Sequence, residues 1–350
     1  MPKKPNIIVA VALAALMSGC DQGSELATVD EAAQMKQEIE ATSNPTLDYA
    51  NAAVADGIFY TSNYFEHDGV TLHYVEAGSG DLIIFYHGFP SYWLSFFDQM
   101  EAFKSSHRVV AIDGLGAGLS DKPDDLDNYK IAALSEHIDA LATHVAGDSK
   151  FTLIGHDWGG ALAMAFAEDR PERLNAVASF NAPSVNIFLE LLRSNEAQQA
   201  TSQYMAIMSK TPQQAVRDNP PGERIWTQSY GGLLGRGEIT QEEYDLFGEA
   251  LRPAAATNGG FNWYRANVPL PSEIDDSDYY PNPPRQIEIP ALLVWGTEDR
   301  TFVPEFIDMM RENITQLEVV IIEGANHWTT MSHPDESTAA IRQLLEGRAN

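Results

Sequence analysis

Short apolar runs recur along most of this 350-residue chain, and they limit its fold more than any other feature. Several are rich in β-branched or aromatic residues and lack polar alternation, which is typical of strands buried on both faces of a mostly parallel sheet. The runs lie at residues 70–75, 82–86, 109–112, 151–154, 176–180, 291–295 and 318–322.

Helical patterns separate these runs. Apolar residues repeat at helical spacing between Ile131 and Val145, and residues 161–168 and 338–345 are rich in helix formers. Strands that alternate with helices predict an α/β fold with a doubly wound, mostly parallel sheet. The alternation stops after Pro183 and resumes near Ile289.

The interruption predicts an insertion. Residues 184–285 hold helical patterns broken by Pro-Pro and Gly-Gly pairs, and we interpret them as a helical lid over the carboxyl ends of the strands. The predicted core is then residues 58–183 together with residues 286–350.

The first twenty residues have the pattern of an export signal. Lys3 and Lys4 precede eleven residues, 7–17, that are apolar but too short for a bilayer, which needs about 20. Residues 16–20 (LMSGC) resemble the lipobox of bacterial lipoproteins, which predicts lipidation of Cys20 and a place on the periplasmic side of a bacterial membrane. A plain signal peptide with an incidental cysteine is the alternative. Residues 21–57 predict an acidic tether with one loose helix.

Composition argues against several classes of partner. The chain has 50 acidic and 22 basic side chains, a net charge of −28, and no Lys/Arg cluster after Lys4, so we expect no nucleic-acid binding. A single cysteine excludes an intramolecular disulfide. His137 and His144 are too far apart on one predicted helix to be a ligand pair, and residues 114–118 lack dinucleotide-site spacing. We therefore expect no metal and no cofactor.

Residues 155–160 (GHDWGG) have the form of a sharp turn from a strand into a helix. Such a turn needs small neighbours so that the backbone can pass, and it raises the central side chain above the sheet. Here that side chain is Asp157. The alternative is that Asp157 only caps the following helix.

Two later segments supply the other members of a triad. Residues 295–299 (WGTED) follow one predicted strand, and residues 323–328 (EGANHW) follow the next. The chain order of nucleophile, acid and histidine is that of α/β-hydrolases.

The chain resembles the epoxide hydrolase branch of the α/β-hydrolase superfamily over roughly residues 60–345. The matching motifs are His87-Gly88-Phe89-Pro90, Asp113 through Gly116 with Gly118 to Ser120, residues 155–160, Gly296 with Asp299, and His327-Trp328. The resemblance implies a nucleophile Asp157, an acid Asp299 and a base His327, with Glu298 as the alternative acid. It also implies an oxyanion hole made by the N–H groups of Phe89 and Trp158. His87 and His156 are expected to shape their turns, with direct chemistry as the alternative.

This assignment explains why a carboxylate occupies the nucleophile position. A carboxylate is ionised at neutral pH, so it attacks a saturated carbon without a general base. The product is an alkyl-enzyme ester. His327, oriented by Asp299, would then activate the water that opens this ester. The partners implied are a small-molecule epoxide and water.

Opening an epoxide also requires a proton donor. Residues 261–267 (FNWYRAN) resemble the lid segment in which epoxide hydrolases carry a ring-opening tyrosine, and Tyr264 matches that residue. Tyr204 is a second candidate. A phenol with a pKa near 10 stays protonated at working pH. For each tyrosine the alternative is a lid aromatic that packs for shape.

Haloalkane or haloacid dehalogenases with the same Asp-His-Asp triad are the alternative function. Phe89 stands where many haloalkane dehalogenases have Asn, and Trp158 follows the nucleophile where haloacetate dehalogenases commonly have Arg. A binding protein without catalysis is a third hypothesis, which hydrolysis of any epoxide would remove. The identity of the epoxide and the oligomeric state do not follow from the sequence.

Overall fold

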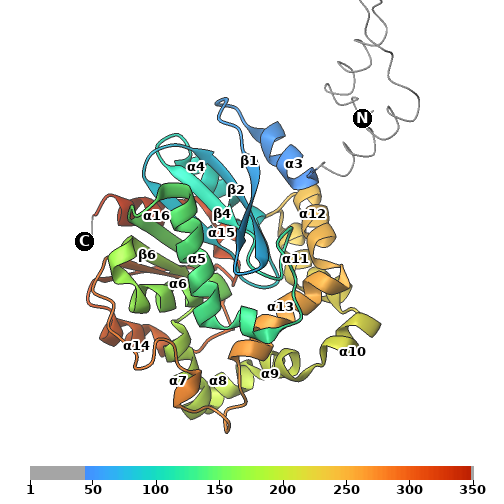
Figure 1. Ribbon diagram of the computed structural model, residues 1–350, viewed down its shortest axis with the longest axis vertical. Helices are drawn as coiled ribbons and strands as arrows, with labels where there is room; N and C mark the ends of the chain where they lie inside the picture. The colour runs from blue at the N-terminus through green and yellow to red at the C-terminus, as the bar shows by residue number, and fades with distance from the viewer. Residues whose placement is uncertain (1–43, 348–350) are drawn as a thin grey trace, which may run out of the picture. The chain divides into compact units, whose positions relative to one another are not determined.

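An eight-stranded sheet forms the centre of the fold in the computed structural model, which describes residues 44–347 (Figure 1). The strand order is β1-β2-β4-β3-β5-β6-β7-β8. The strands are β1 (Thr61–His67), β2 (Val70–Gly78), β3 (Leu82–Tyr86), β4 (Arg108–Ile112), β5 (Phe151–His156), β6 (Leu174–Phe180), β7 (Ala291–Gly296) and β8 (Leu317–Ile322).

The six strands from β3 to β8 pair in parallel, whereas β1 and β2 are antiparallel additions at one edge. This arrangement confirms the predicted α/β fold with a mostly parallel sheet. Strand β1 is absent from the sequence prediction. It is an edge strand of mixed polar and aromatic residues (TSNYFEH) that is only partly buried, so it lacks the apolar run of a central strand.

Helices cover both faces of the sheet, which explains the apolar runs. On β3, Ile84 packs into the core beneath α5 (Ile131–Ala146) and α6 (Trp158–Asp169), while Phe85 packs into the core beneath α4 (Phe97–Phe103) and α16 (Pro334–Leu345). Neighbouring residues of one strand therefore lie in opposite cores. The remaining core helices are η1 (Trp93–Phe96), η2 (Leu126–Tyr129), η3 (Pro171–Arg173), α14 (Phe306–Asn313) and α15 (Thr329–Ser332).

A helical region is inserted between β6 and β7 (Figure 1). It consists of α7 (Val185–Ser194), α8 (Glu196–Thr201), α9 (Gln203–Lys210), α10 (Gln213–Asp218), α11 (Gly222–Arg236), α12 (Gln241–Leu251), α13 (Ala254–Asn267) and η4 (Asp276–Asp278). Aromatic side chains of α13 pack against the loop after β3 and the start of α6, for example Phe261 against Phe89. The insertion thus covers the carboxyl ends of the strands, and we refer to it as the lid.

The segment before β1 differs in part from the predicted tether of residues 21–57. Helix α3 (Pro45–Ala53) packs on the core, with Ala50 fully buried and the Asn51 side chain hydrogen-bonded to both backbone groups of Tyr60. Apolar residues on one face of this helix, such as Leu47, pack against the core. The acidic composition of the whole segment does not reveal this face. The predicted export signal and Cys20 lie outside the described residues.

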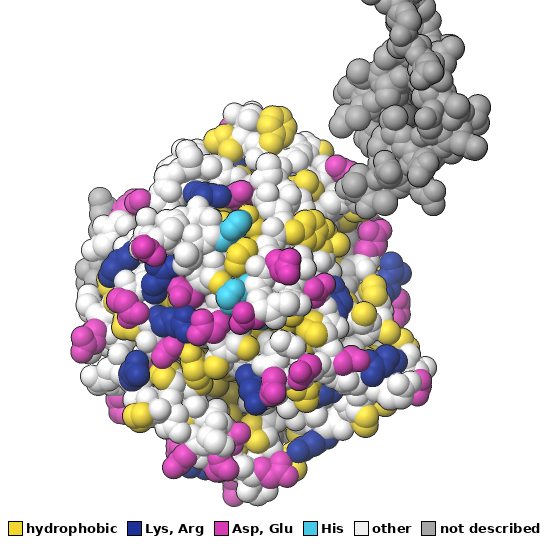
Figure 2. Space-filling model, in the orientation of Figure 1, with side chains coloured by type: hydrophobic (Ala, Val, Ile, Leu, Met, Phe, Trp, Pro, Cys, Tyr) yellow, Lys and Arg dark blue, Asp and Glu magenta, His cyan; other side chains and the backbone are white. Residues whose placement is uncertain are grey.

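The surface mixes charges of both signs. On the face drawn in Figure 2, Lys and Arg side chains lie among Asp and Glu. Arg170, for instance, is within ion-pair distance of Glu136 and Asp139. Between residues 44 and 347, no helix has the length and apolar character needed to cross a membrane.

Candidate active site

The turn between β5 and α6 presents Asp157 as predicted by its glycines. Asp157 has φ 55° and ψ −122°, and its N–H donates to the Phe180 carbonyl oxygen at 3.0 Å. A Cβ atom at Gly159 would lie 1.9 Å from the Tyr86 oxygen, so only glycine allows β3 and α6 to approach this closely. Asp157 occupies the N-cap position of α6, but its side chain makes no capping hydrogen bond. The carboxylate is directed instead at other partners.

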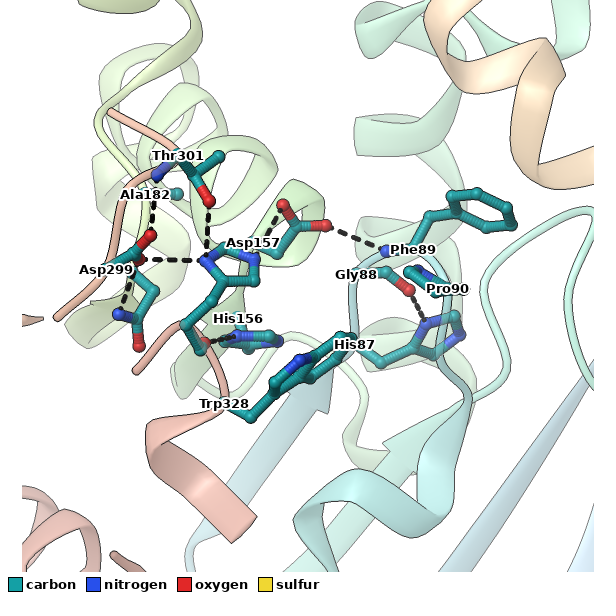
Figure 3. A network of polar contacts seen from close by, with 12 residues as sticks. His87, Gly88, Phe89, Pro90, His156, Asp157, Ala182, Asp299, Thr301 and Trp328 are labelled. Carbon is teal, nitrogen blue, oxygen red and sulfur yellow. Dashed lines mark hydrogen bonds and ion pairs between the residues drawn. The ribbon is translucent and has the colours of Figure 1, made fainter. Parts of the chain in front are cut away.

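Asp157 and Asp299, labelled in Figure 3, follow β5 and β7, and His327, which follows β8, lies between them. His327 Nε2 lies 3.4 Å from Asp157 Oδ2, and His327 Nδ1 lies 2.8 Å from Asp299 Oδ2. Glu298, the alternative acid, is exposed, whereas the Asp299 side chain is fully buried. The structure therefore places Asp299, and not Glu298, against the histidine.

The protonation states follow from this geometry. Burial opposes ionisation of both carboxyls, but His327 outweighs it, and the pKa values of Asp157 and Asp299 both lie below the ordinary range. Burial also opposes charge on His327, yet Asp299 and Asp157 together raise its pKa to about 10. The resting site is thus an imidazolium between two carboxylates.

The predicted oxyanion donors both reach Asp157. The Phe89 N–H donates to Asp157 Oδ1 at 2.8 Å, and the Trp158 N–H hydrogen-bonds to the same carboxylate and helps to lower its pKa. A Cβ at Gly88 would lie 2.2 Å from Asp157 Oδ1, so this approach also requires glycine. The Phe89 N–H is thus aligned on Oδ1, with the Trp158 N–H beside the same carboxylate.

Tyr264 and Tyr204 face the nucleophile from the lid. Tyr264 is 1% exposed, and its ring packs edge-on to Trp158 and Phe89, with centroids 5.1 and 6.1 Å away. Tyr204 is 37% exposed overall, but its hydroxyl faces inward and hydrogen-bonds to that of Tyr264. Burial first, and then neighbouring groups including the charge of Asp157, raise both pKa values well above 10. Both phenols therefore remain protonated near neutral pH.

Comparisons with known proteins agree with this arrangement. Residues 81–334 match the family model described as alpha/beta hydrolase fold. Epoxide hydrolase 1 of Caenorhabditis elegans is 30% identical over 297 residues, 82% of this chain and 70% of that protein. The AB hydrolase superfamily protein YfhM of Bacillus subtilis is 30% identical over 79% of this chain and 94% of its own length.

Among solved structures, an epoxide hydrolase of Bacillus megaterium in complex with an inhibitor superposes with a TM-score of 0.73. It is 27% identical and covers 81% of this chain and all of its own. This chain belongs to the epoxide hydrolase-like branch of the α/β-hydrolases.

The pocket of this epoxide hydrolase-like protein is mostly apolar. Asn267 is one of its few polar lining residues, and its side chain is already bonded to the backbone of Ile131, Tyr129 and Trp263. An amide so engaged is not free to bind a polar substituent, so the lining suits an uncharged group. The lining residues are Asp157, Trp158, Ala161, Pro183, Val185, Phe188, Met205, Asn267 and Phe302.

The two histidines of the motifs bond to backbone in this hydrolase. His87 Nδ1 donates to the Gly88 oxygen at 2.6 Å, and its Nε2 accepts the Gly114 N–H at 2.8 Å. His156 Nε2 donates to the His327 carbonyl oxygen at 2.7 Å. Burial lowers the pKa of both residues, that of His156 to about 4, so both are neutral. These contacts fit the expected role in shaping the turns.

Two polar residues of the site were missed by the sequence analysis. Asn181 follows β6 with φ 57° and donates from Nδ2 to Asp299 Oδ2 at 2.8 Å. Thr301 donates its N–H to Asp299 Oδ1 at 2.8 Å, and its hydroxyl lies 3.2 Å from His327 Nδ1. A search for polar residues directly after each predicted strand would have found Asn181, because parallel strands end at one edge of the sheet. No comparable signal marks Thr301.

Proposed function

We propose that the protein is an epoxide hydrolase that converts a neutral, predominantly apolar epoxide to a vicinal diol through an ester on Asp157. The observation that carries this proposal is the pair of lid phenols, Tyr204 and Tyr264, whose ring centroids lie 6.4 Å apart and whose pKa values are raised in part by the nearby charge of Asp157. An epoxide needs both a nucleophile and a proton donor. The relatives named as epoxide hydrolases support the same assignment.

The first step is attack on a ring carbon. Phe89 and Trp158 hold the Asp157 carboxylate through backbone N–H groups, with Phe89 on Oδ1, so the other oxygen, Oδ2, which faces His327 Nε2, forms the new carbon–oxygen bond. The ring carbon–oxygen bond breaks, and the departing oxygen takes a proton from Tyr264 or Tyr204. The electron pair of that bond thus ends on a neutral hydroxyl group. The ester carbonyl oxygen is Oδ1.

The second step is hydrolysis of this ester. Esterification removes the negative charge of Asp157 that helped to raise the pKa of His327, so the imidazolium can now give its proton back to the phenolate left by the first step and become a base. It takes a proton from water, whose oxygen adds to the Asp157 carbonyl carbon. The Phe89 and Trp158 N–H groups stabilise the oxyanion on Oδ1. Collapse breaks the carbonyl carbon–Oδ2 bond; the departing Oδ2 takes the proton of the new Asp157 carboxyl group and leaves in the diol, while the water oxygen stays in Asp157 as part of the restored carboxylate.

Cleavage of a carbon–halogen bond is the alternative function. A halide needs hydrogen-bond donors but no proton, and the Trp158 indole would be the natural donor. That indole is hydrogen-bonded to the Tyr264 hydroxyl, and Tyr264 in turn contacts Tyr204. The arrangement favours a substrate whose leaving atom is an oxygen that must be protonated.

A panel of epoxides and haloalkanes tests the function directly. We expect the purified protein to release vicinal diols from neutral alkyl or aryl epoxides, and to release halide from haloalkanes at a rate at least about a hundredfold lower, because that reaction leaves both phenols unused. Diol is measured by chromatography and halide by ion detection. Halide release that exceeds diol formation across the panel would establish the dehalogenase alternative.

We expect the two half-reactions to depend differently on pH. The lowered pKa of Asp157 keeps the nucleophile ionised, so ester formation should stay constant over about pH 5 to 8. Ester decay requires neutral His327 and should fall about tenfold per pH unit below the pKa of His327 in the ester. Single-turnover quench experiments separate the two rates. A parallel loss of both rates in acid would contradict this division of roles.

The location of the protein remains a proposal from its first residues. We propose that the mature chain begins at Cys20, carries lipid there and lies on the periplasmic side of a bacterial membrane. Intact-mass measurement of the protein expressed in a bacterial host should show a start at Cys20 with added acyl mass, and Cys20→Ser should release it from the membrane fraction. An unmodified start elsewhere, or retention of Met1, would contradict lipidation.

A further inference from the structure

Gln198 is a lid residue whose side chain is bonded to the loop that carries the triad acid. It lies in α8 and is fully buried. Its Oε1 accepts the Val303 N–H at 2.9 Å, and its Nε2 donates to the Thr301 carbonyl oxygen at 3.2 Å. A backbone N–H only donates and a carbonyl only accepts, so the orientation of the amide is determined. The side chain pairs with this loop as a peptide group of a neighbouring strand would.

This loop contacts both Asp299 and His327, the two triad residues that lie outside the nucleophile turn. Thr301 donates its N–H to Asp299, and its hydroxyl lies beside His327 Nδ1. The two backbone groups bonded to Gln198 flank Phe302, which lines the pocket. The position of this short segment therefore determines how Asp299 faces His327.

The same amide also reaches the helix that carries Tyr204. Gln198 Nε2 lies 2.9 Å from the Ser202 hydroxyl, and Ser202 is the buried N-cap residue of α9. Tyr204 follows two residues later and directs its hydroxyl at Tyr264. One side chain thus contacts both the acid loop and the start of the helix with a proposed proton donor.

We propose that Gln198 is a positioning residue that holds the lid and the triad in register, so that Tyr204 and the Asp299–His327 pair are aligned on the same substrate. This inference rests on the proposed function, because it assigns Gln198 an influence on both half-reactions. Tyr204 serves ester formation, and Asp299 with His327 serves ester decay. Gln198 touches no reacting atom and acts only through these residues.

Gln198→Glu is the sharpest test because it replaces the side-chain NH₂ group by an oxygen and leaves the shape of the side chain almost unchanged. The variant side chain keeps an oxygen that accepts the Val303 N–H. The amide nitrogen that donates to the Thr301 carbonyl oxygen is replaced by a second oxygen, so this hydrogen bond is lost. A lost buried hydrogen bond and a new repulsion should slow ester formation and ester decay by about tenfold or more each. Asp299 raises the pKa of His327, so a displaced Asp299 should move the acid limb of ester decay to lower pH, whereas the added carboxylate charge alone would raise that pKa and move the limb to higher pH. A residue that only stabilises the fold would not move this limb.

Gln199→Glu is the matched control. It makes the same chemical change one residue along α8, where the Gln199 amide donates to the Leu192 carbonyl oxygen at 3.0 Å, within the lid itself. We expect both rates to stay within about twofold of the wild type and the acid limb to stay in place. Thermal unfolding of both variants, followed by circular dichroism, shows that they are folded at the assay temperature.

Ser202→Ala separates the contact of Gln198 with α9 from its contact with the acid loop. It tests the inference even if Gln198→Glu does not fold. It removes only the contact to the N-cap of α9, so ester formation should slow while ester decay keeps its rate. Folded Gln198→Glu protein that behaves like Gln199→Glu would overturn the inference, and so would unchanged ester formation in Ser202→Ala. In either case, wild-type protein that still forms the ester and the diol leaves the proposed function standing. Wild-type protein that forms neither overturns both.

Discussion

The His327→Gln variant is expected to stop after the first half-reaction and to retain its substrate as an ester on Asp157. An ionised carboxylate attacks without a base, and the backbone N–H groups of Phe89 and Trp158 that hold it are untouched by the substitution. Hydrolysis of the ester has no base left. The lifetime of the ester should therefore increase by about a thousandfold or more.

Mass spectrometry of this variant after incubation with an epoxide should show one added substrate mass on the peptide that contains residues 155–160. Asp157→Ala in the same background should abolish the adduct. A single turnover of wild-type protein in ¹⁸O-labelled water gives an independent check. The first diol should contain unlabelled oxygen from Asp157, whereas label in that diol would mean that Asp157 only positions water.

Removal of the phenol groups should have the second largest effect. Tyr264→Phe is expected to slow ester formation by about 10² to 10⁴ and to leave ester decay nearly unchanged, because the ring oxygen then departs without its proton donor. Tyr204→Phe should act on the same half-reaction, since its hydroxyl is hydrogen-bonded to that of Tyr264. Pre-steady-state quench experiments measure the ester formed in each variant.

Tyr129→Phe is a suitable control for these substitutions. Tyr129 is also fully buried, and its hydroxyl donates to the Pro123 carbonyl oxygen at 3.0 Å, away from Asp157. Loss of this hydroxyl should affect stability by about 1 kcal/mol and leave ester formation intact. Unchanged ester formation in both Tyr264→Phe and Tyr204→Phe would show that these two tyrosines only pack the lid.

The sequence by itself determined those features that depend on neighbours along the chain. The central strands were predictable because strands with helices on both faces must be apolar throughout, as Leu82–Tyr86 illustrates. The Asp157 turn was predictable because no residue with a Cβ atom fits at its glycines, where α6 lies against the end of β3. The acid and the histidine followed from their places after later strands, since the ends of parallel strands converge.

Only the tertiary structure decided which polar groups complete the site. Strand β1 and helix α3 carry no strong local pattern, and their positions depend on the surfaces against which they pack. Asn181, Thr301 and Gln198 come from three separate segments, and each makes a hydrogen bond to Asp299 or to the loop that follows it, whose position is set by the completed fold. The contact between Tyr204 and Tyr264 likewise requires α9 and α13 to pack together. Such contacts join residues far apart in the chain, and side-chain type alone does not specify them because each amide or hydroxyl has many alternative partners.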